Sequence, residues 1–166
     1  DPLSLSEVIL GCVTQQGEQA ANIAKTSASR AGWPASVAGM TVNRFCSSSI
    51  DAIALAAMKV NCGQTSALVA GGVEMMSRVP LLADGARVFA DHDFGVNHQM
   101  LLMGAGADLI ASRGEMSRED LNAVAFGSHQ RALRAQKEER FTSIVPIATS
   151  KGLISSDECV RPSLTS

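Results

Sequence analysis

The stretch Val42-Asn43-Arg44-Phe45-Cys46-Ser47-Ser48-Ser49 decides the fold, because it joins a strand pattern to a helix pattern. Residues 40–45 are predicted to form a strand. Downstream, apolar residues recur at helical spacing and predict a helix with one apolar stripe, made of Ile50, Ile53, Ala54, Ala57 and Met58. Cys46 is therefore expected at the junction between a buried strand and the N-terminus of an apolar helix.

The segments on either side repeat the same alternation. Residues 7–13 form a short apolar run that predicts a buried strand, and residues 22–31 predict a helix. Residues 66–70 predict a third strand, which ends at Gly71-Gly72. Strand, helix, strand, helix and strand in this order predict an α/β layer in which the strands pair in parallel.

The character of the chain changes after Pro80. Residues 81–103 have no sustained period and predict a long excursion or lid, a kind of segment that is usually functional. Helices are expected over 104–113 and 118–136, the second opened by a capping box of Ser117 and Asp120, and a strand over 141–147. We therefore divide the chain into residues 1–80, which carry the α/β pattern, and residues 81–166, a loop region with helices.

The composition excludes several classes of protein. Of the 166 residues, 46% are hydrophobic and 18% charged, which is a globular composition and not a disordered one. The net charge of −2 and the 4% of aromatic residues argue against a nucleic-acid partner. The apolar runs are too short to cross a bilayer, so no membrane association is expected.

Four cysteines lie at positions 12, 46, 62 and 159, without the spacing of a zinc site or of a CxxC redox motif. Free thiols in a reducing compartment are therefore expected, and the cytoplasm is the predicted location. No bound metal is predicted.

Cys46 carries the clearest chemical signal. A helix N-terminus stabilises an anion, and the thiolate is the form of cysteine that attacks. Backbone N–H groups at the same place can hold the oxyanion of a tetrahedral intermediate. This arrangement predicts acyl transfer through a thioester. The alternative is that Cys46 acts as a small buried hydrophobe, which is the role expected of Cys12.

A nucleophilic thiol needs a base or an electrostatic partner. His92 and His98 lie in the lid-like excursion, and either can be considered as the base. His129 falls among charged residues of a predicted amphipathic helix and is expected at the surface. A metal site built on His92 and His98 with flanking aspartates is the weaker alternative.

Three motifs resemble those of one enzyme family. Residues 42–49 resemble the nucleophile motif of thiolases, the acetyl-CoA acetyltransferase and 3-ketoacyl-CoA thiolase family. The segment 71–80 resembles the family's GGxExMSxxP motif, with Met75 where serine is usual, and residues 103–108 resemble its MGxTAE motif. The GGVE and MSRVP matches argue against a ketoacyl synthase. The resemblance runs from about Gly11 to Pro162.

The resemblance implies a fold and an activity. The fold is a thiolase-like half, a mixed and mostly parallel sheet between helices, with an inserted irregular and helical loop domain. Cys46 would be the acyl-accepting nucleophile, and Met103 would line the acyl pocket. The substrates would be acyl-CoA and CoA, with no metal or prosthetic group as cofactor. Family members are dimers or tetramers.

Some family motifs are not present in the sequence. The histidine of GHP, the second cysteine of CxGGG and the asparagine of NEAF have no counterpart here. We therefore expect a partial N-terminal half of a thiolase, inactive by itself, whose parent cleaves a 3-ketoacyl-CoA or runs the reverse Claisen condensation. The alternative is a non-catalytic, thiolase-derived binding or scaffold module completed by another chain. Acyl length, direction, and a mitochondrial or peroxisomal location stay open.

Overall fold

The computed structural model describes residues 1–150 and 152–161, and the chain divides into two compact units, residues 1–94 and 95–166. The first unit contains a three-stranded parallel sheet in the order β2-β1-β3. Around the sheet, the regular elements up to residue 72 are the strands β1 (Glu7–Gly11), β2 (Ala38–Val42) and β3 (Val69–Gly72), the helices α1 (Ile23–Arg30) and α2 (Ser48–Asn61), and the short 3-10 turns Pro2–Ser4 and Gly17–Gln19. The predicted alternation is confirmed, with strand limits that differ by at most three residues.

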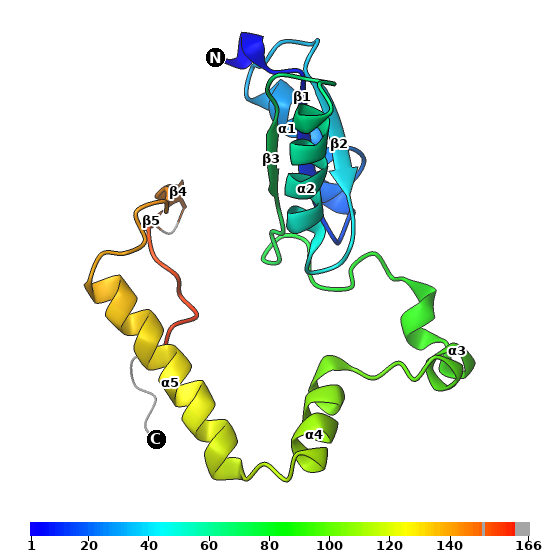
Figure 1. The fold of residues 1–166 in the computed structure, drawn as a ribbon, viewed down its shortest axis with the longest axis vertical. Coiled ribbons are helices and arrows are strands. Elements are labelled where there is room, and N and C mark those ends of the chain that lie inside the picture. The colour runs from blue at the N-terminus through cyan, green and yellow to red at the C-terminus, as the bar shows by residue number, and fades with distance from the viewer. Residues whose placement is uncertain (151, 162–166) are drawn as a thin grey trace. The chain divides into compact units, whose positions relative to one another are not determined.

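The strand order explains why the helices lie on opposite faces of the sheet (Figure 1). The connection from β1 through α1 leads to one side of β1, and the connection from β2 through α2 crosses back to the other side. Parallel crossovers are right-handed, so opposite directions of travel place the two helices on opposite faces. The result is a parallel sheet between helices, as the sequence predicted.

Side-chain alternation along β1 divides its contacts between the two helices. Val8 packs with Ala24 and Ala28 of α1 in the hydrophobic core, which also includes Val37. Leu5, Leu10, Trp33 and Val69 pack around this core and are partly buried. Gly11, on the other face, lies against the first turn of α2.

The apolar stripe predicted for α2 does not face the sheet. Its members Ile50, Ile53 and Met58 are exposed, whereas Ser48 and Ala52 are the buried residues of the helix. The reason is close packing: a Cβ atom at Gly11 would lie 2.5 Å from the backbone of Ser48. Only small side chains fit on the face of α2 that approaches the sheet so closely.

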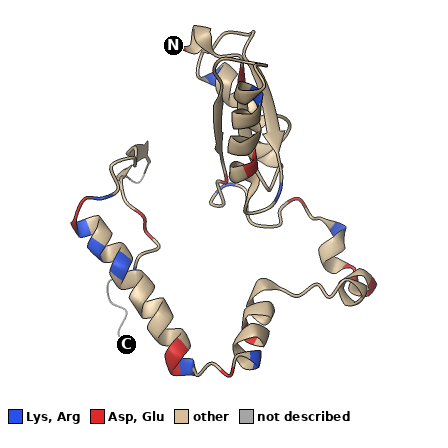
Figure 2. Ribbon diagram, in the orientation of Figure 1, with Lys and Arg blue, Asp and Glu red and all other residues tan. Residues whose placement is uncertain are grey.

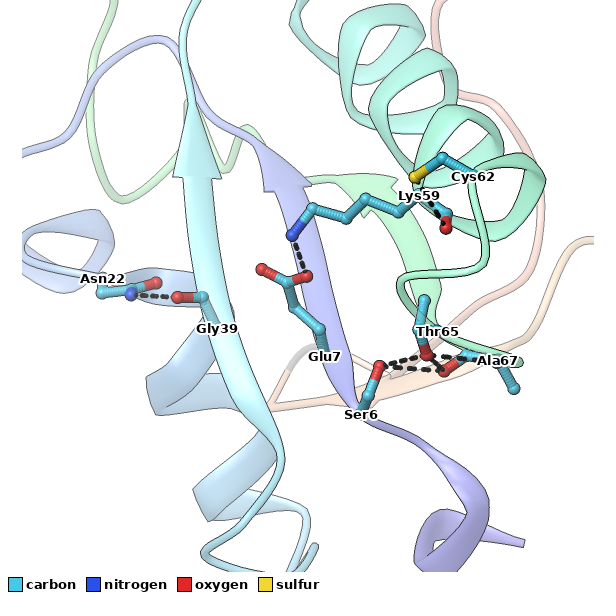
Figure 3. Close-up of polar contacts among 8 residues, drawn as sticks. All are labelled: Ser6, Glu7, Asn22, Gly39, Lys59, Cys62, Thr65 and Ala67. Carbon is cyan, nitrogen blue, oxygen red and sulfur yellow. Dashed lines mark hydrogen bonds and ion pairs between the residues drawn. The ribbon is translucent and has the colours of Figure 1, made fainter.

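Polar contacts fix the far end of α2 and the start of the strands (Figure 3). The Lys59 ammonium in the last turn of α2 pairs with the Glu7 carboxylate on β1, and both side chains are largely buried. The Asn22 side chain caps α1 by accepting from the Lys25 N–H at 3.2 Å, and it donates to the Gly39 carbonyl at 2.7 Å. These contacts tie each helix to a strand of the sheet.

The second unit contains two helices and a small hairpin. The helices are α4 (Met103–Arg113) and α5 (Arg118–Lys137), and the hairpin pairs β4 (Ile147–Thr149) with β5 (Gly152–Ile154) in antiparallel register. The short helix α3 (His92–Asn97) spans the division between the units and follows a 3-10 turn at Arg87–Ala90. Where the first domain ends, predicted at residue 80, stays a prediction.

The capping box that opens α5 is confirmed. The Ser117 hydroxyl accepts from the Asp120 N–H at 3.1 Å, and the Asp120 carboxylate accepts from the Ser117 N–H at 3.1 Å. Acidic residues lie in the first turn of α5 and basic residues in its last turn, which favours the helix dipole (Figure 2).

The strand predicted over 141–147 is wrong, because only its last residue enters β4. Short apolar segments do not distinguish a strand from an irregular connection without their partners. Among the helices of residues 1–150 and 152–161, none combines the length and apolar character that a bilayer span requires.

The glycine contact between β1 and α2 yields a stability prediction. Gly11→Ala should lower the free energy of unfolding by about 2–3 kcal/mol, because the added methyl meets backbone atoms that cannot move independently. The matched control is Gly71→Ala in β3, where a Cβ would make an ordinary contact 3.7 Å from Leu10 and should change stability by less than about 1 kcal/mol. The single tryptophan, Trp33, packs against this core and reports unfolding in urea by fluorescence. Equal effects of the two substitutions would contradict the packing described.

Candidate functional site

Three polar segments meet at the carboxyl edge of the parallel sheet. Residues 12–14 follow β1, residues 43–46 follow β2, and Glu74 follows β3 closely. In open α/β sheets, ligands bind at the carboxyl ends of the strands. The predicted nucleophile therefore lies at the edge where such a sheet places its functional groups.

Cys46 lies between β2 and α2, as the sequence predicted, and its thiol is free and exposed. The alternative of a buried small hydrophobe is therefore wrong for Cys46. It is correct for Cys12, which is 1% exposed. Burial raises the pKa of the Cys12 thiol, the negative charge of Glu74 adds to this effect, and the hydrogen bond from Gln19 opposes it. Cys12 is thus held in its protonated form.

The backbone before Cys46 adopts an unusual conformation. Phe45 has a φ of 46°, in the left-handed region that side chains other than glycine rarely enter. The Asn43 Oδ1 atom accepts from the Phe45 N–H at 2.9 Å and closes a tight turn. Among the described residues, no protein group accepts a hydrogen bond from the Cys46 N–H. The predicted chemistry requires a donor of this kind, one without a protein acceptor, to bind an oxyanion.

The buried hydroxyl of Ser48 closes the loop from the helix side. It accepts from the Arg44 N–H at 2.8 Å and donates to the Phe45 carbonyl at 2.5 Å. The Arg44 guanidinium forms an ion pair with Asp51 of α2 at 2.5 Å. These bonds fasten both sides of the loop to the first turns of α2, with Cys46 at the centre.

An open depression of about 560 Å³ lies beside this loop. Its lining comes from residues 42–44 and from α2, where Asp51, Ala54, Leu55 and Met58 contribute. Cys46 does not belong to the lining. The depression therefore adjoins the loop without covering the thiol.

The carboxylate of Glu74 joins the third strand to the loop after β1. Its two oxygens accept from the Val13 N–H at 2.9 Å, from the Thr14 N–H at 3.3 Å and from the Gln19 amide at 3.0 Å. Partial burial alone would raise the pKa of Glu74, but these hydrogen bonds and one from the Thr14 side chain outweigh burial and lower it. Glu74 therefore stays ionised to a lower pH than an ordinary glutamate.

The sequence analysis assigned no role to Gln19 or Glu74, although both fall in the segments that resemble thiolases. Gln19 is 2% exposed and lies 55 residues from its partner, so no local pattern predicts the contact. One signal was available: Thr14 and Glu74 both follow predicted parallel strands, whose carboxyl ends meet at one edge.

The other predicted residues fall outside the segments that follow the three strands. His92 begins α3, and the Nδ1 atom of His129 on α5 accepts from the Arg161 N–H at 3.2 Å. Met103 begins α4 in the second unit and is 80% exposed. The roles predicted for His92, His98 and Met103 stay predictions. In the described ranges, no three His, Cys, Asp or Glu side chains are grouped to hold a metal ion.

A free thiol after a parallel strand and before a helix is placed where a cysteine can act as a nucleophile. Comparison with known proteins identifies the family. The model of the thiolase N-terminal domain matches residues 1–166, and the chain belongs to the thiolase family.

Individual relatives agree with this assignment. The chain is 35% identical to the 3-ketoacyl-CoA thiolase of Bacillus subtilis and 38% identical to the β-ketoadipyl-CoA thiolase of Pseudomonas aeruginosa, with 98% of the chain covered in both. The crystal structure of the Bacillus anthracis acetyl-CoA acetyltransferase matches 99% of the chain with a TM-score of 0.81 and 33% identity. The chain spans 45% of the first relative, 46% of the second and 46% of the solved chain. The names of these proteins denote enzymes that act on CoA thioesters.

The positive φ of Phe45 predicts that glycine is more stabilising than alanine at this position, the reverse of their order in a helix. Phe45→Gly should be more stable than Phe45→Ala by about 1 kcal/mol, because glycine adopts a positive φ without a steric penalty. Both variants lose the exposed ring, so their difference isolates the backbone. At Ser29, in the regular helix α1, the same pair should show the opposite order. Urea unfolding followed by Trp33 fluorescence measures the free energy of unfolding of all four variants. A Phe45→Ala protein more stable than Phe45→Gly would contradict the conformation described for the turn.

The lowered pKa of Glu74 predicts a pH-dependent contribution to stability. A folded-state pKa below the unfolded value means that the contribution is fully present above the ordinary value of about 4.3 and is lost as the pH falls through the folded pKa. Glu74→Gln should therefore destabilise the first unit by about 1 kcal/mol at pH 7. The difference in the free energy of unfolding between the unsubstituted protein and Glu74→Gln should shrink as the pH falls below about 4.3. A difference that grows would contradict the lowered pKa of Glu74.

Proposed function

We propose that this chain supplies the nucleophilic half of a thiolase, in which Cys46 accepts an acyl group as a thioester. The whole enzyme would cleave a 3-ketoacyl-CoA by thiolysis or run the reverse Claisen condensation. The observation that carries the proposal is the placement of the free, exposed Cys46 thiol just before α2. The backbone N–H of the same residue donates no hydrogen bond to any described protein group. The family membership and the names of the relatives support it.

The Cys46 thiolate attacks the thioester carbonyl of an acyl-CoA, and the carbonyl oxygen becomes an oxyanion next to the Cys46 N–H. When the intermediate collapses, the acyl–Sγ bond has formed and the bond between the acyl carbon and the CoA sulfur has broken. The proton lost by the Cys46 thiol ends on the CoA thiol. No oxidant or reductant takes part.

The remaining roles follow from the resemblance. Residues 1–80 would form the first part of the N-terminal α/β domain, and residues 81–166 the loop-domain region with helices, of which residues 81–116 would cover the CoA-binding face. Met103, at the exposed start of α4, would line the acyl pocket. We propose acyl-CoA and CoA as substrates with no metal or prosthetic group. A homodimer or tetramer is proposed as the assembly, and the cytoplasm as the location, in keeping with four free cysteines.

The first test is acylation of the chain itself. Acetyl-CoA is incubated with the protein, and peptide mass mapping locates the added acetyl group. We expect acetylation of Cys46 well above that of Cys62, an exposed thiol at the other end of α2. Cys46→Ser should abolish the fast modification and Cys62→Ser should leave it unchanged. Equal labelling of the two cysteines, or no labelling of Cys46, would overturn the proposal and favour the non-catalytic scaffold module.

The second test is turnover. We expect no net thiolysis of acetoacetyl-CoA with CoA by the chain of residues 1–166, because its sequence has no GHP or CxGGG motif to complete the site. The measurement is the loss of acetoacetyl-CoA absorbance. Sustained turnover that Cys46→Ser removes would show that this chain completes the reaction with its own residues.

A further inference from the structure

A continuous series of hydrogen bonds links Gln19, through Glu74 and Asn43, to the residue before Cys46. It begins at Gln19, whose side chain is almost fully buried. The Gln19 amide nitrogen donates to the Glu74 carboxylate at 3.0 Å and to the Thr14 carbonyl at 3.0 Å, and its oxygen accepts from the Met75 N–H at 2.5 Å. Gln19 therefore holds Glu74 and the loop after β1 in one arrangement.

Glu74 then fixes the next link of the series. Its oxygens accept from the N–H groups of Val13 and Thr14, so both peptide groups are held facing the carboxylate. The Val13 carbonyl, which shares a peptide group with the Thr14 N–H, accepts from the Asn43 Nδ2 atom at 3.1 Å. The orientation that Glu74 imposes on the Val13 backbone thus determines where Asn43 finds its acceptor.

Asn43 uses the other end of its side chain on the nucleophile loop. The Asn43 Oδ1 atom accepts from the N–H of Phe45, the residue with positive φ that directly precedes Cys46. A conformation of this kind is strained for a residue with a side chain and persists only where the surroundings determine it. The Asn43 amide is one of the groups that do so, together with the Ser48 hydroxyl.

We propose that Gln19, Glu74 and Asn43 are positioning residues for acyl transfer, which fix the backbone of Cys46 through this series of bonds. The inference rests on the proposed function of Cys46. None of the three side chains forms a hydrogen bond with the Cys46 thiol, so each acts through the loop. What they set is the direction of the Cys46 Sγ atom and of its N–H relative to an acyl carbonyl.

Asn43→Asp is the sharpest variant, because it changes one atom of an exposed side chain. Aspartate keeps the oxygen that accepts from Phe45 but places a second oxygen against the Val13 carbonyl, where a donor was. Glu74→Gln breaks the series one link earlier, since its amide group cannot accept from all three donors. Two links of the same series can thus be cut separately.

Matched controls make the same chemical changes elsewhere in the first unit. Asn61→Asp repeats the amide-to-acid change at the last residue of α2. Glu18→Gln removes a carboxylate that pairs with Arg78 at the surface and has no bond to the loop after β1. Neither control should alter acylation of Cys46.

The experiment compares the rate of Cys46 acetylation by acetyl-CoA with the rate of iodoacetamide alkylation, both mapped by peptide mass. Alkylation needs no oxyanion site, so it reports access to the thiol alone. We expect Asn43→Asp and Glu74→Gln each to slow acetylation at least about tenfold while alkylation changes much less. The double variant should lose little more than either single variant, because both cut one series.

Two other cysteines separate positioning from unfolding. Exposed Cys62 should be alkylated at the same rate in Asn43→Asp and Glu74→Gln as in the unsubstituted protein, and buried Cys12 should stay unlabelled in Asn43→Asp. If Glu74→Gln labels Cys12, that variant has opened and Asn43→Asp alone decides. Unchanged acetylation in Asn43→Asp, or losses that add in the double variant, would overturn the inference. Absence of Cys46 acetylation in the unsubstituted protein would instead overturn the proposed function.

Discussion

The close approach of α2 to the sheet is the constraint on which the rest of the first unit depends. Gly11 lies against the backbone of Ser48 and Ser49, and a Cβ at Gly72 would lie 1.9 Å from the Ser49 hydroxyl and 3.0 Å from the Gly11 carbonyl. A side chain at either glycine would push the first turn of α2 away from the strand ends. Because Cys46 comes directly before that turn, the two glycines determine where the thiol lies.

The loops at the same edge are ordered by hydrogen bonds and not by apolar burial. The side chains of Asn43 and Glu74 satisfy backbone groups that follow the strands, while Ser48 closes the nucleophile loop from the helix side. Such bonds define the directions of N–H groups before any ligand arrives, which is the condition for stabilising an oxyanion. The hydrogen bonds therefore hold the segments on either side of Cys46 to the strand ends and to α2.

The sequence predicted those features that depend on local patterns. The alternation of strands and helices, the position of Cys46 and the capping box at Ser117 each follow from residues close together in the chain. Features that depend on distant partners were missed: the face of α2 that meets the sheet, and the contact of Gln19 with Glu74. A helical stripe shows where apolar residues gather, but the glycines of two strands decide which side of the helix can approach.

The central claim is that close packing of α2 on the sheet places Cys46 for acyl transfer. Gly72→Ala tests this placement, because the added methyl would meet the Ser49 hydroxyl, which can rotate away, and the Ser49 Cβ at 3.1 Å, which can move only with the first turn of α2. The substitution should therefore displace that turn without unfolding the unit. The measurement is the rate of Cys46 acetylation by acetyl-CoA, with Gly71→Ala as the neighbouring control. The account predicts a marked loss of rate for Gly72→Ala alone. Equal rates in the two variants, with folding intact, would contradict it.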